Sequence, residues 1–438
     1  MIAPLAAVAL PTWLDPDRAF QAGFAEHPYS FWLDAGPDAA IGWSWVGSGR
    51  PEADADAVRL TDLTAGAEGG VEPDAEAGPF RGGWVGWSGY DDAADRAGAP
   101  TGAPDGAAPQ TVWLRAERFL AFDHARRRVW AFAADAETLA TEAAGWAGAA
   151  PPPASAPRSR GMAVARHLPG AYADLIAECR DAIREGDAYQ LCLTTRFSVA
   201  GDIDPAESFR ALRAATASHH AGFVRSGSVA LASASPERFL EVQGGVVRTH
   251  PIKGTRPRGD DVVRDALLAA ELLESPKERA ENVMIVDLMR NDLSRVSVAG
   301  SIAVDRLLDV ESYPAVHQLV STVSGILRPG TTLGDLLDAA FPAGSMTGAP
   351  KLSAMTILHG LEAAPRGVFA GCFGWVGDDG AADLAMIIRS IVFHPGGAYV
   401  GAGGGITWGS DAAAEVAEVG VKARGPLRAI GAELPPGW

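Results

Sequence analysis

The sequence predicts a fold that combines strands and helices, and three stretches of the chain indicate this class. Residues 1–135 mix short apolar runs with turn residues, as strands and hairpins do. Apolar residues then recur at helical spacing from Tyr172 to Ile183 and stop at Gly186, which predicts a helix that buries Cys179. Residues 188–195 alternate with a period of two, so we expect a strand there with Gln190 on one face.

A stretch rich in alanine, proline and serine divides the chain. It runs over residues 143–161, lacks apolar periodicity and is therefore typical of a linker. A chain of 438 residues is long enough for two domains or one large composite. We expect a β-rich N-terminal lobe at residues 1–142, a linker at 143–164 and a larger domain at 165–438.

Composition and charge exclude several classes of function. The chain has 37 Lys and Arg residues against 54 Asp and Glu residues, a formal net charge of -17, which repels a nucleic-acid backbone. Cys179, Cys192 and Cys372 are far apart and odd in number, so neither a disulfide framework nor a cysteine zinc site is expected. No apolar run approaches the ~20 residues that cross a bilayer. We expect a soluble, cytoplasmic protein that binds neither nucleic acid nor membrane.

The segment Pro251–Gly259 places one lysine, Lys253, between an isoleucine and a glycine, with Arg256 and Arg258 just beyond. Its prolines and glycines forbid a long helix, so we expect a rigid loop. The two arginines would favour the neutral, nucleophilic form of the Lys253 amine, and their planar guanidinium groups suit a carboxylate substrate. The alternative is a solvated basic loop.

Two pairs of glutamates recur at helical spacing. Glu278 and Glu281 follow Ser275-Pro276, and Glu415 and Glu418 follow Ser410-Asp411. Each pair lies three residues apart on one helix face, and four such carboxylates repel one another unless a divalent cation lies between them. Oxygen ligands of this kind suit Mg²⁺. The alternatives are solvated helix faces and, for Glu278, a capping box with Ser275.

Three further features suit an anionic substrate or exclude a catalytic base. Arg389 stands in an apolar run, Ala385 to Phe393, that we expect to be a buried strand, where a lone arginine needs an anionic partner. The run from Gly401 to Gly405, which contains Gly403 and Gly404, lacks the final glycine of a dinucleotide-binding motif, so the expected loop better suits a small carboxylate. Gln190 carries an amide, which cannot act as a base; the alternative is a glutamine that faces solvent from an edge strand.

The Lys253 segment, which reads Pro-Ile-Lys-Gly-Thr, resembles the aminodeoxychorismate synthase component I group of the chorismate-utilising enzymes. That family also holds anthranilate, isochorismate and salicylate synthases. The N-terminal third resembles the family weakly, through residues 27–34 and 80–86, and its pattern is too loose to assign the tryptophan pocket that members often carry. Further blocks agree in order with the family: Ser235–Phe239, Lys277–Asp292, Phe341–Lys351 and Gly401–Lys422.

The resemblance implies an α+β fold, namely a large β-sandwich of mostly antiparallel sheets with helices packed outside and the active site in a cleft between its halves. It implies that chorismate and ammonia give 4-amino-4-deoxychorismate, the precursor of 4-aminobenzoate. Lys253 would attack carbon 2 of the ring, and Glu237 would protonate the hydroxyl that leaves carbon 4. The alternative for Glu237 is an ion pair with Arg238 or another cation.

The resemblance also implies roles for the binding residues. Glu281 and Glu418 would be the direct Mg²⁺ ligands, with Glu278 and Glu415 beside them. Arg389 would hold the ring carboxylate, although Phe369 replaces the tyrosine that often accompanies it, and Gly403 to Gly405 would approach the enolpyruvyl carboxylate. Thr255 and Lys422 complete the substrate-binding set. Family members that use ammonia carry glutamine at the position of Gln190, whereas members that use water carry lysine.

The implied partner is a separate glutamine amidotransferase subunit that supplies ammonia, because the chain shows no such domain. Two alternatives stay open: anthranilate synthase component I, which usually has alanine at the position of Lys253, and a catalytically silent paralogue that binds chorismate. His317 lies one position before the place where anthranilate synthases have a histidine. Since adjacent residues face different ways, we expect a structural role for His317.

Overall fold

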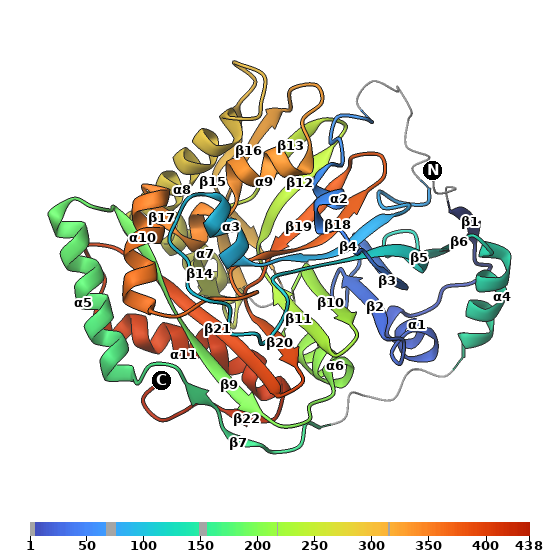
Figure 1. Ribbon diagram of the computed structural model, residues 1–438, viewed down its shortest axis with the longest axis horizontal. Helices are drawn as coiled ribbons and strands as arrows, with labels where there is room; N and C mark the ends of the chain where they lie inside the picture. The colour runs from blue at the N-terminus through green and yellow to red at the C-terminus, as the bar shows by residue number, and fades with distance from the viewer. Residues whose placement is uncertain (1–4, 67–75, 149–155, 217, 314–315) are drawn as a thin grey trace.

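The computed structural model describes residues 5–66, 76–148, 156–216, 218–313 and 316–438. Within these residues, 20 strands form one hydrogen-bonded sheet in which the paired strands run antiparallel, and the helices pack outside it (Figure 1). A short parallel pair joins β7 (Gly161–Met162) to β22 (Ala432–Glu433). The predicted α+β class with mostly antiparallel strands is therefore confirmed.

The first half of the chain supplies most of the strands at one end of the sheet. Its helices are α1 (Pro16–Gly23), α2 (Ala55–Arg59), α3 (Tyr90–Arg96), α4 (Ala136–Trp146), α5 (Pro169–Glu185) and α6 (Pro205–Ala215). Its strands are β1 (Ala6–Ala9), β2 (Tyr29–Asp34), β3 (Trp43–Pro51), β4 (Gly83–Ser88), β5 (Thr111–Asp123), β6 (Arg128–Ala133), β7 (Gly161–Met162), β8 (Val164–Ala165), β9 (Gln190–Ala200) and β10 (His220–Ser226).

The second half carries the helices nearest the predicted site. They are α7 (Val262–Glu274), α8 (Pro276–Ser294), α9 (Leu333–Ala340), the 3₁₀ helix η1 (Gly344–Met346), α10 (Lys351–Glu362) and α11 (Ala412–Ala429). The strands are β11 (Val229–Ser235), β12 (Arg238–Gln243), β13 (Val246–Thr249), β14 (Ile252–Pro257), β15 (Ala303–Ser312), β16 (Val316–Ile326), β17 (Gly348–Ala349), β18 (Cys372–Gly377), β19 (Ala382–Met386), β20 (Ser390–His394), β21 (Gly397–Ile406) and β22 (Ala432–Glu433).

Local sequence accounts for the helix that the apolar stripe predicts. Pro169 occupies the first turn of α5, where its missing N–H costs nothing. The buried stripe of this helix contains Tyr172, Ile176 and Cys179, and Gly186 ends it in the left-handed conformation with φ of 90°. Both the helix and the buried position of Cys179 are thus confirmed.

Strand pairing joins the part of the chain before the expected linker to the part after it. β2 pairs with β10, and β4 pairs with β18, so strands that precede residue 142 are continuous in the sheet with strands that follow residue 165. α4 extends to Trp146, and β7 pairs with β22. Residues 149–155 of the expected linker lie outside the described residues.

Two hydrophobic cores lie on either side of β9. Leu191 and Leu193 belong to one core, whereas Cys192 belongs to the other. The alternation expected for this strand is therefore present, and it leaves the start of β9 between the two cores. Tyr189 precedes the strand and is exposed.

Three segments differ from their expected local structure. The Lys253 segment is strand β14, paired with β16, and not a loop; a bulge at Gly254, with φ of 79°, accommodates its irregular sequence. Residues 403–405 lie within β21 and not in a loop, because glycine can pair in a strand where close neighbours leave no room for side chains. The expected strand from Ala385 to Phe393 is broken at residues 387–389 into β19 and β20.

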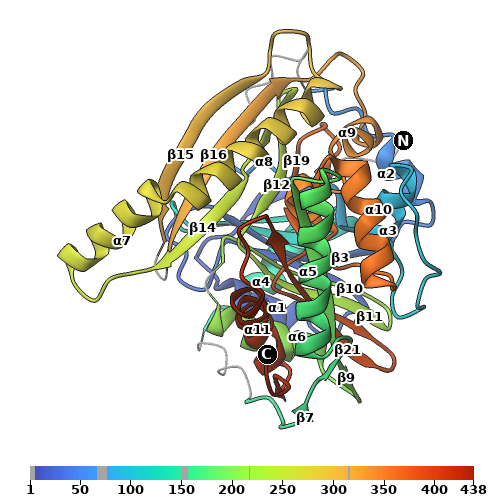
Figure 2. The ribbon, with the colours of Figure 1, turned by 90° about the vertical axis from the view of Figure 1, so that its left-hand side faces the viewer.

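β14, β15 and α7 project together from the rest of the molecule, as Figure 2 shows. α7 packs on β14, β15 and β16, and its first-turn residues Val262 and Val263 are exposed. None of the helices in the described ranges is long and apolar enough to span a membrane.

Candidate active site

Gln190 opens β9 with its side chain completely buried, at 0% exposure. Its amide oxygen and nitrogen have no hydrogen-bond partner among the described residues. β9 pairs with β21, and a Cβ atom on Gly405 would lie 2.4 Å from the Gln190 amide nitrogen. The solvent-facing alternative for Gln190 is therefore wrong. The glycine at position 405 makes room for an amide whose hydrogen-bonding capacity is free for a ligand.

Gly403 and Gly404 lie against helix α11. The Lys422 ammonium donates a hydrogen bond of 2.8 Å to the Gly403 carbonyl oxygen, and a Cβ on Gly404 would lie 3.0 Å from Glu415 Oε2. β20 pairs with β21 only over residues 397–400, so the edge of residues 401–406 opposite β9 is not covered by a described strand. Free backbone groups at this edge can bind a small polar ligand.

Glu237 lies between β11 and β12, and Ser345 Oγ donates a hydrogen bond of 2.9 Å to its Oε1 atom. Burial raises the pKa of Glu237, while the positive charges of Lys253 and Lys422 and the Ser345 hydrogen bond oppose that rise. A carboxylic acid with a raised pKa suits proton donation near neutral pH.

The neighbouring Arg238 points away from this site. Its guanidinium pairs with Asp383 at 3.0 Å and with Glu241 at 3.3 Å. The proposed ion pair between Glu237 and Arg238 is therefore wrong. The charges that act on the Glu237 carboxyl group are instead those of Lys253 and Lys422.

Lys253 lies on β14 opposite Leu319 of β16. The Lys253 ammonium forms no hydrogen bond or ion pair with any residue in the described part of the chain. Its charge lowers the pKa values of Glu237, Glu281 and Cys192 against the effect of burial, so the amine lies among these three groups.

The two arginines beyond Lys253 do not take the expected role. Arg256 donates to Glu271 at 2.9 Å and lies 3.6 Å from Glu278, and Arg258 forms two hydrogen bonds of 2.7 Å with Asp265. The prediction that they activate Lys253 and grip a substrate carboxylate is wrong, because α7 and α8 supply carboxylates that neutralise both guanidinium groups. Thr255 is exposed and pairs with Gln318.

The two glutamate pairs approach each other from α8 and α11. Burial raises the pKa values of Glu281 and Glu415, and the Glu415 charge adds to the rise at Glu281. Against burial, Lys422 lowers the pKa of Glu418, with which it forms an ion pair of 2.7 Å. The described residues contain no group of three or more His, Cys, Asp or Glu side chains that is ready to hold a metal ion.

Glu278 forms only half of the capping box that was the alternative for this residue. Its backbone N–H donates to Ser275 Oγ at 3.4 Å, as in a capping box, but its carboxylate lies near Arg256. A Cβ on Gly254 would lie 2.9 Å from Glu278 Oε2, so this carboxylate packs on the bulge that follows Lys253.

Arg389 lies at the break between β19 and β20, with φ of 53°, in the left-handed region that non-glycine residues rarely adopt. Its guanidinium forms no hydrogen bond or ion pair with the residues that the structure describes. Burial lowers the pKa of Arg389, and the charge of Glu418 opposes this. An enclosed guanidinium without a bound anion is suited to bind one from outside the chain.

His317 has a structural role, as expected. It is 2% exposed, and its ring nitrogens lie 2.8 Å from Ser312 Oγ and 2.9 Å from Asp265 Oδ1.

The sequence did not predict two groups near the site, namely Ser345 and the buried pair of Glu362 and Arg366. Ser345 lies within the block Phe341–Lys351, but its contact with Glu237 joins residues far apart in sequence.

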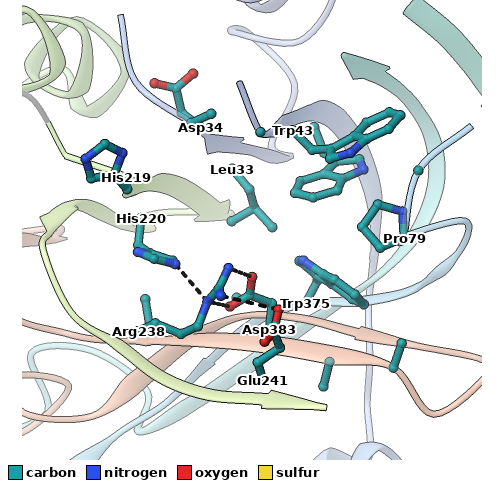
Figure 3. A pocket seen from close by; sticks show the side chains of 18 of the residues that line it. Leu33, Asp34, Trp43, Pro79, His219, His220, Arg238, Glu241, Trp375 and Asp383 are labelled. Carbon is teal, nitrogen blue, oxygen red and sulfur yellow. Dashed lines mark hydrogen bonds and ion pairs between the residues drawn. The ribbon is translucent and has the colours of Figure 1, made fainter. Parts of the chain in front are cut away.

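A separate cavity of about 530 Å³ has Arg238 in its lining (Figure 3). Aromatic side chains of Trp43 and Trp375 line one wall. The opposite wall carries Arg238, paired with Asp383, and His220. None of the residues predicted for the active site lines this cavity, so the two regions are distinct.

The sequence profile of the chorismate binding enzymes matches residues 21–428. Two relatives called aminodeoxychorismate synthase, from Streptomyces pristinaespiralis and Streptomyces griseus, are 38% and 37% identical over 95% and 98% of this chain; the alignments cover 64% of each relative. The solved structure of anthranilate synthase component I from Streptococcus pneumoniae TIGR4 has a TM-score of 0.73 and 27% identity, covering 97% of this chain and 92% of that one.

Proposed function

The chain belongs to the family of chorismate binding enzymes, and on that premise we propose that it converts chorismate and ammonia to 4-amino-4-deoxychorismate through a covalent intermediate on Lys253. The observation that carries the proposal is the arrangement of Lys253 and Glu237: an ammonium with no partner among the described residues acts on a carboxyl group whose pKa burial raises. Two relatives that are 37–38% identical to this chain over the aligned residues, which cover 64% of each relative, carry the name of that activity.

In the proposed reaction, the neutral Lys253 amine forms a bond to carbon 2 of the ring as the two conjugated ring double bonds shift and the bond from carbon 4 to its hydroxyl breaks. Hydroxide is a poor leaving group, so Glu237 donates a proton and water departs. Ammonia then attacks carbon 4, both ring double bonds return to their original positions, and the bond between carbon 2 and the lysine nitrogen breaks. Glu237 accepts the proton that the adding ammonia loses, which restores the acid.

Three groups would contact the substrate, and two of them would bind its carboxylates. The guanidinium of Arg389, which has no ion pair with a described residue, supplies a planar pair of donors for one carboxylate. The open edge of β21 at Gly403–Gly405 would hold the other, with Lys422 fixing that strand through the Gly403 carbonyl. The free amide of Gln190 lies beside Gly405, where it would contact substrate or incoming ammonia without acting as a base.

We propose Mg²⁺ as the cofactor, held by Glu281 and Glu418 with Glu278 and Glu415 beside them. Burial raises the pKa values of Glu281 and Glu415, and a cation bound there would oppose that rise by favouring the charged carboxylates. Mg²⁺ commonly uses one or two protein carboxylates together with water and substrate oxygens, so a preformed protein cage is not required. Bound there, the ion would neutralise a carboxylate of the substrate.

Ammonia would come from a separate glutamine amidotransferase subunit, and the product would lead to 4-aminobenzoate. The support is chemical: Gln190 offers no base to activate water, whereas neutral ammonia is nucleophilic enough to attack without a base. The cytoplasm, where chorismate chemistry and free thiols coexist, is the expected setting; Cys179, Cys192 and Cys372 are all unpaired and buried.

The test combines product identity with intact-protein mass. Purified chain is incubated with chorismate, Mg²⁺ and ammonium, and the product is identified by chromatography and mass spectrometry. Without ammonium, the wild type should gain the mass of chorismate less one water. Lys253→Arg keeps the positive charge near Glu237 but should gain no mass and form no product. Release of anthranilate and pyruvate would instead support anthranilate synthase, and chorismate binding without turnover would support a silent paralogue.

A further inference from the structure

The buried arginine Arg366 joins two segments of the candidate site. Its side chain donates two hydrogen bonds to Glu362, at 2.7 and 2.8 Å, one of 2.7 Å to the Met346 carbonyl oxygen and one of 2.8 Å to the Cys192 carbonyl oxygen. Its guanidinium also stacks on the Tyr90 ring at 4.3 Å. Arg366 is only 3% exposed, so its acceptors are fixed parts of the protein and not solvent.

The contacts of Glu362 extend this junction. Its Oε1 atom accepts hydrogen bonds from the backbone N–H of Thr194, at 2.8 Å, and from the Thr194 hydroxyl, at 2.9 Å. Cys192 and Thr194 are both on β9, the strand that begins with Gln190. Met346 ends η1, the 3₁₀ turn that contains Ser345. The pair of Glu362 and Arg366 therefore fastens η1 to β9.

Ser345 connects this junction to the reacting groups, because its hydroxyl donates to Glu237 at 2.9 Å. A planar guanidinium holds several acceptors in a fixed geometry, which lysine cannot reproduce with a single ammonium. We propose that Arg366 is a positioning residue that holds η1 against β9 so that Ser345 stays in hydrogen-bond contact with Glu237. This inference rests on the proposed role of Glu237 as proton donor.

The charges around Glu237 determine what the loss of this contact does. Lys253 on β14, Lys422 on α11 and the Ser345 hydroxyl on η1 all stabilise the Glu237 carboxylate and lower its pKa, whereas burial raises it. Removing the Ser345 bond therefore raises the pKa of Glu237. Since the acid must be protonated to donate, the decline of activity at high pH should move to higher pH, while kcat falls because the proton donor is no longer held in place.

The experiment compares the pH dependence of kcat for wild type, Ser345→Ala, Arg366→Lys and the double variant. Both single variants should lower kcat about tenfold and shift the high-pH decline upward. The double variant should shift it no further than Ser345→Ala alone, because both changes remove the same contact. Arg213→Lys is the matched control: Arg213 also pairs with a buried carboxylate, Asp34 at 2.7 Å, and stacks on Trp32, but it contacts neither η1 nor β9.

The outcomes separate this inference from the proposed function. If the wild type makes a product other than aminodeoxychorismate, the proposed function is wrong. The four profiles of kcat against pH would still show whether Arg366 and Ser345 affect the pKa of Glu237. Coincident profiles for wild type and Arg366→Lys overturn the inference. If Arg366→Lys does not fold, an unshifted profile for Ser345→Ala overturns it. A crystal structure of Arg366→Lys that retains the contact between Ser345 and Glu237 overturns it without any activity measurement.

Discussion

The amide nitrogen of Gln190 occupies the space that a side chain at position 405 would need: a Cβ on Gly405 would lie 2.4 Å from it. The two residues are on paired strands, β9 and β21, and the amide has no hydrogen-bond partner among the described residues. A buried amide of this kind is costly unless a ligand satisfies it. Position 405 thus controls where the Gln190 side chain can point.

Gly405→Ala should displace the Gln190 amide and lower kcat/KM with ammonium by about tenfold, with little effect on stability. The expected loss matches about 1.4 kcal/mol, the value of one ordinary hydrogen bond to the substrate or nucleophile. The methyl group meets the end of a flexible side chain, which can move aside, so the melting temperature should change little. Gly409→Ala is the control, because a Cβ there meets nothing within 4 Å. Equal activity of the two variants would contradict a role for the Gln190 amide.

Glu237→Gln should lower kcat by roughly 10²–10⁴-fold, the usual contribution of a general acid. The amide keeps the shape of the side chain and its contact with Ser345 but cannot donate a proton to the departing hydroxyl. Steady-state kinetics across pH should show that the variant loses the high-pH decline that we attribute to the Glu237 carboxyl group. If the decline persists unchanged in the variant, another group is the acid.

Arg389→Gln should weaken chorismate binding about 10- to 100-fold, consistent with ~1.5–3 kcal/mol for a hydrogen bond to a charged group. The melting temperature without ligand should not fall, because the wild-type guanidinium forms no ion pair with a described residue and burial already disfavours its charge. Calorimetric titration with chorismate measures the affinity. Arg118→Gln, which removes a half-buried arginine paired with Asp135 and Glu142, is the control and should bind chorismate normally.

The stability of the protein without Mg²⁺ should fall as pH rises above about 4.5. The pKa values of Glu281 and Glu415 are raised in the folded state, so the folded protein binds more protons than the unfolded chain between the ordinary and the raised values. The stabilisation from these two glutamates is complete at pH values below their pKa in the unfolded chain. It is lost as the pH rises through their pKa in the folded protein. Thermal melting from pH 4.5 to 8 measures it.

Mg²⁺ should reverse this loss, because a cation favours the charged carboxylates and stabilises the folded state that binds it. Glu281→Gln together with Glu415→Gln should flatten the pH dependence and abolish the effect of Mg²⁺ on the melting temperature. Glu274→Gln alters an exposed carboxylate at the end of α7 and serves as the control. An undiminished effect of Mg²⁺ in the double variant would place the ion elsewhere.

Much of the local structure followed from the sequence. The apolar stripe and Gly186 predicted α5 with its end, and the period of two predicted β9. These features depend on the backbone preferences and burial pattern of adjacent residues, which a sequence displays directly. The family resemblance also implied roles for Lys253, Glu237 and Arg389.

Contacts between distant residues were decided only in the tertiary structure. Arg256 and Arg258 looked like neighbours of Lys253, yet the carboxylates of α7 and α8 neutralise them, and residues 403–405 looked like a loop, yet they pair with β9. Arg389 looked like a strand residue but lies at a break with positive φ. The sequence by itself determined which chemical groups the protein has and much of its local secondary structure. The tertiary structure alone decided which groups meet, because a charge or a glycine takes its role from partners that the fold brings from far along the chain.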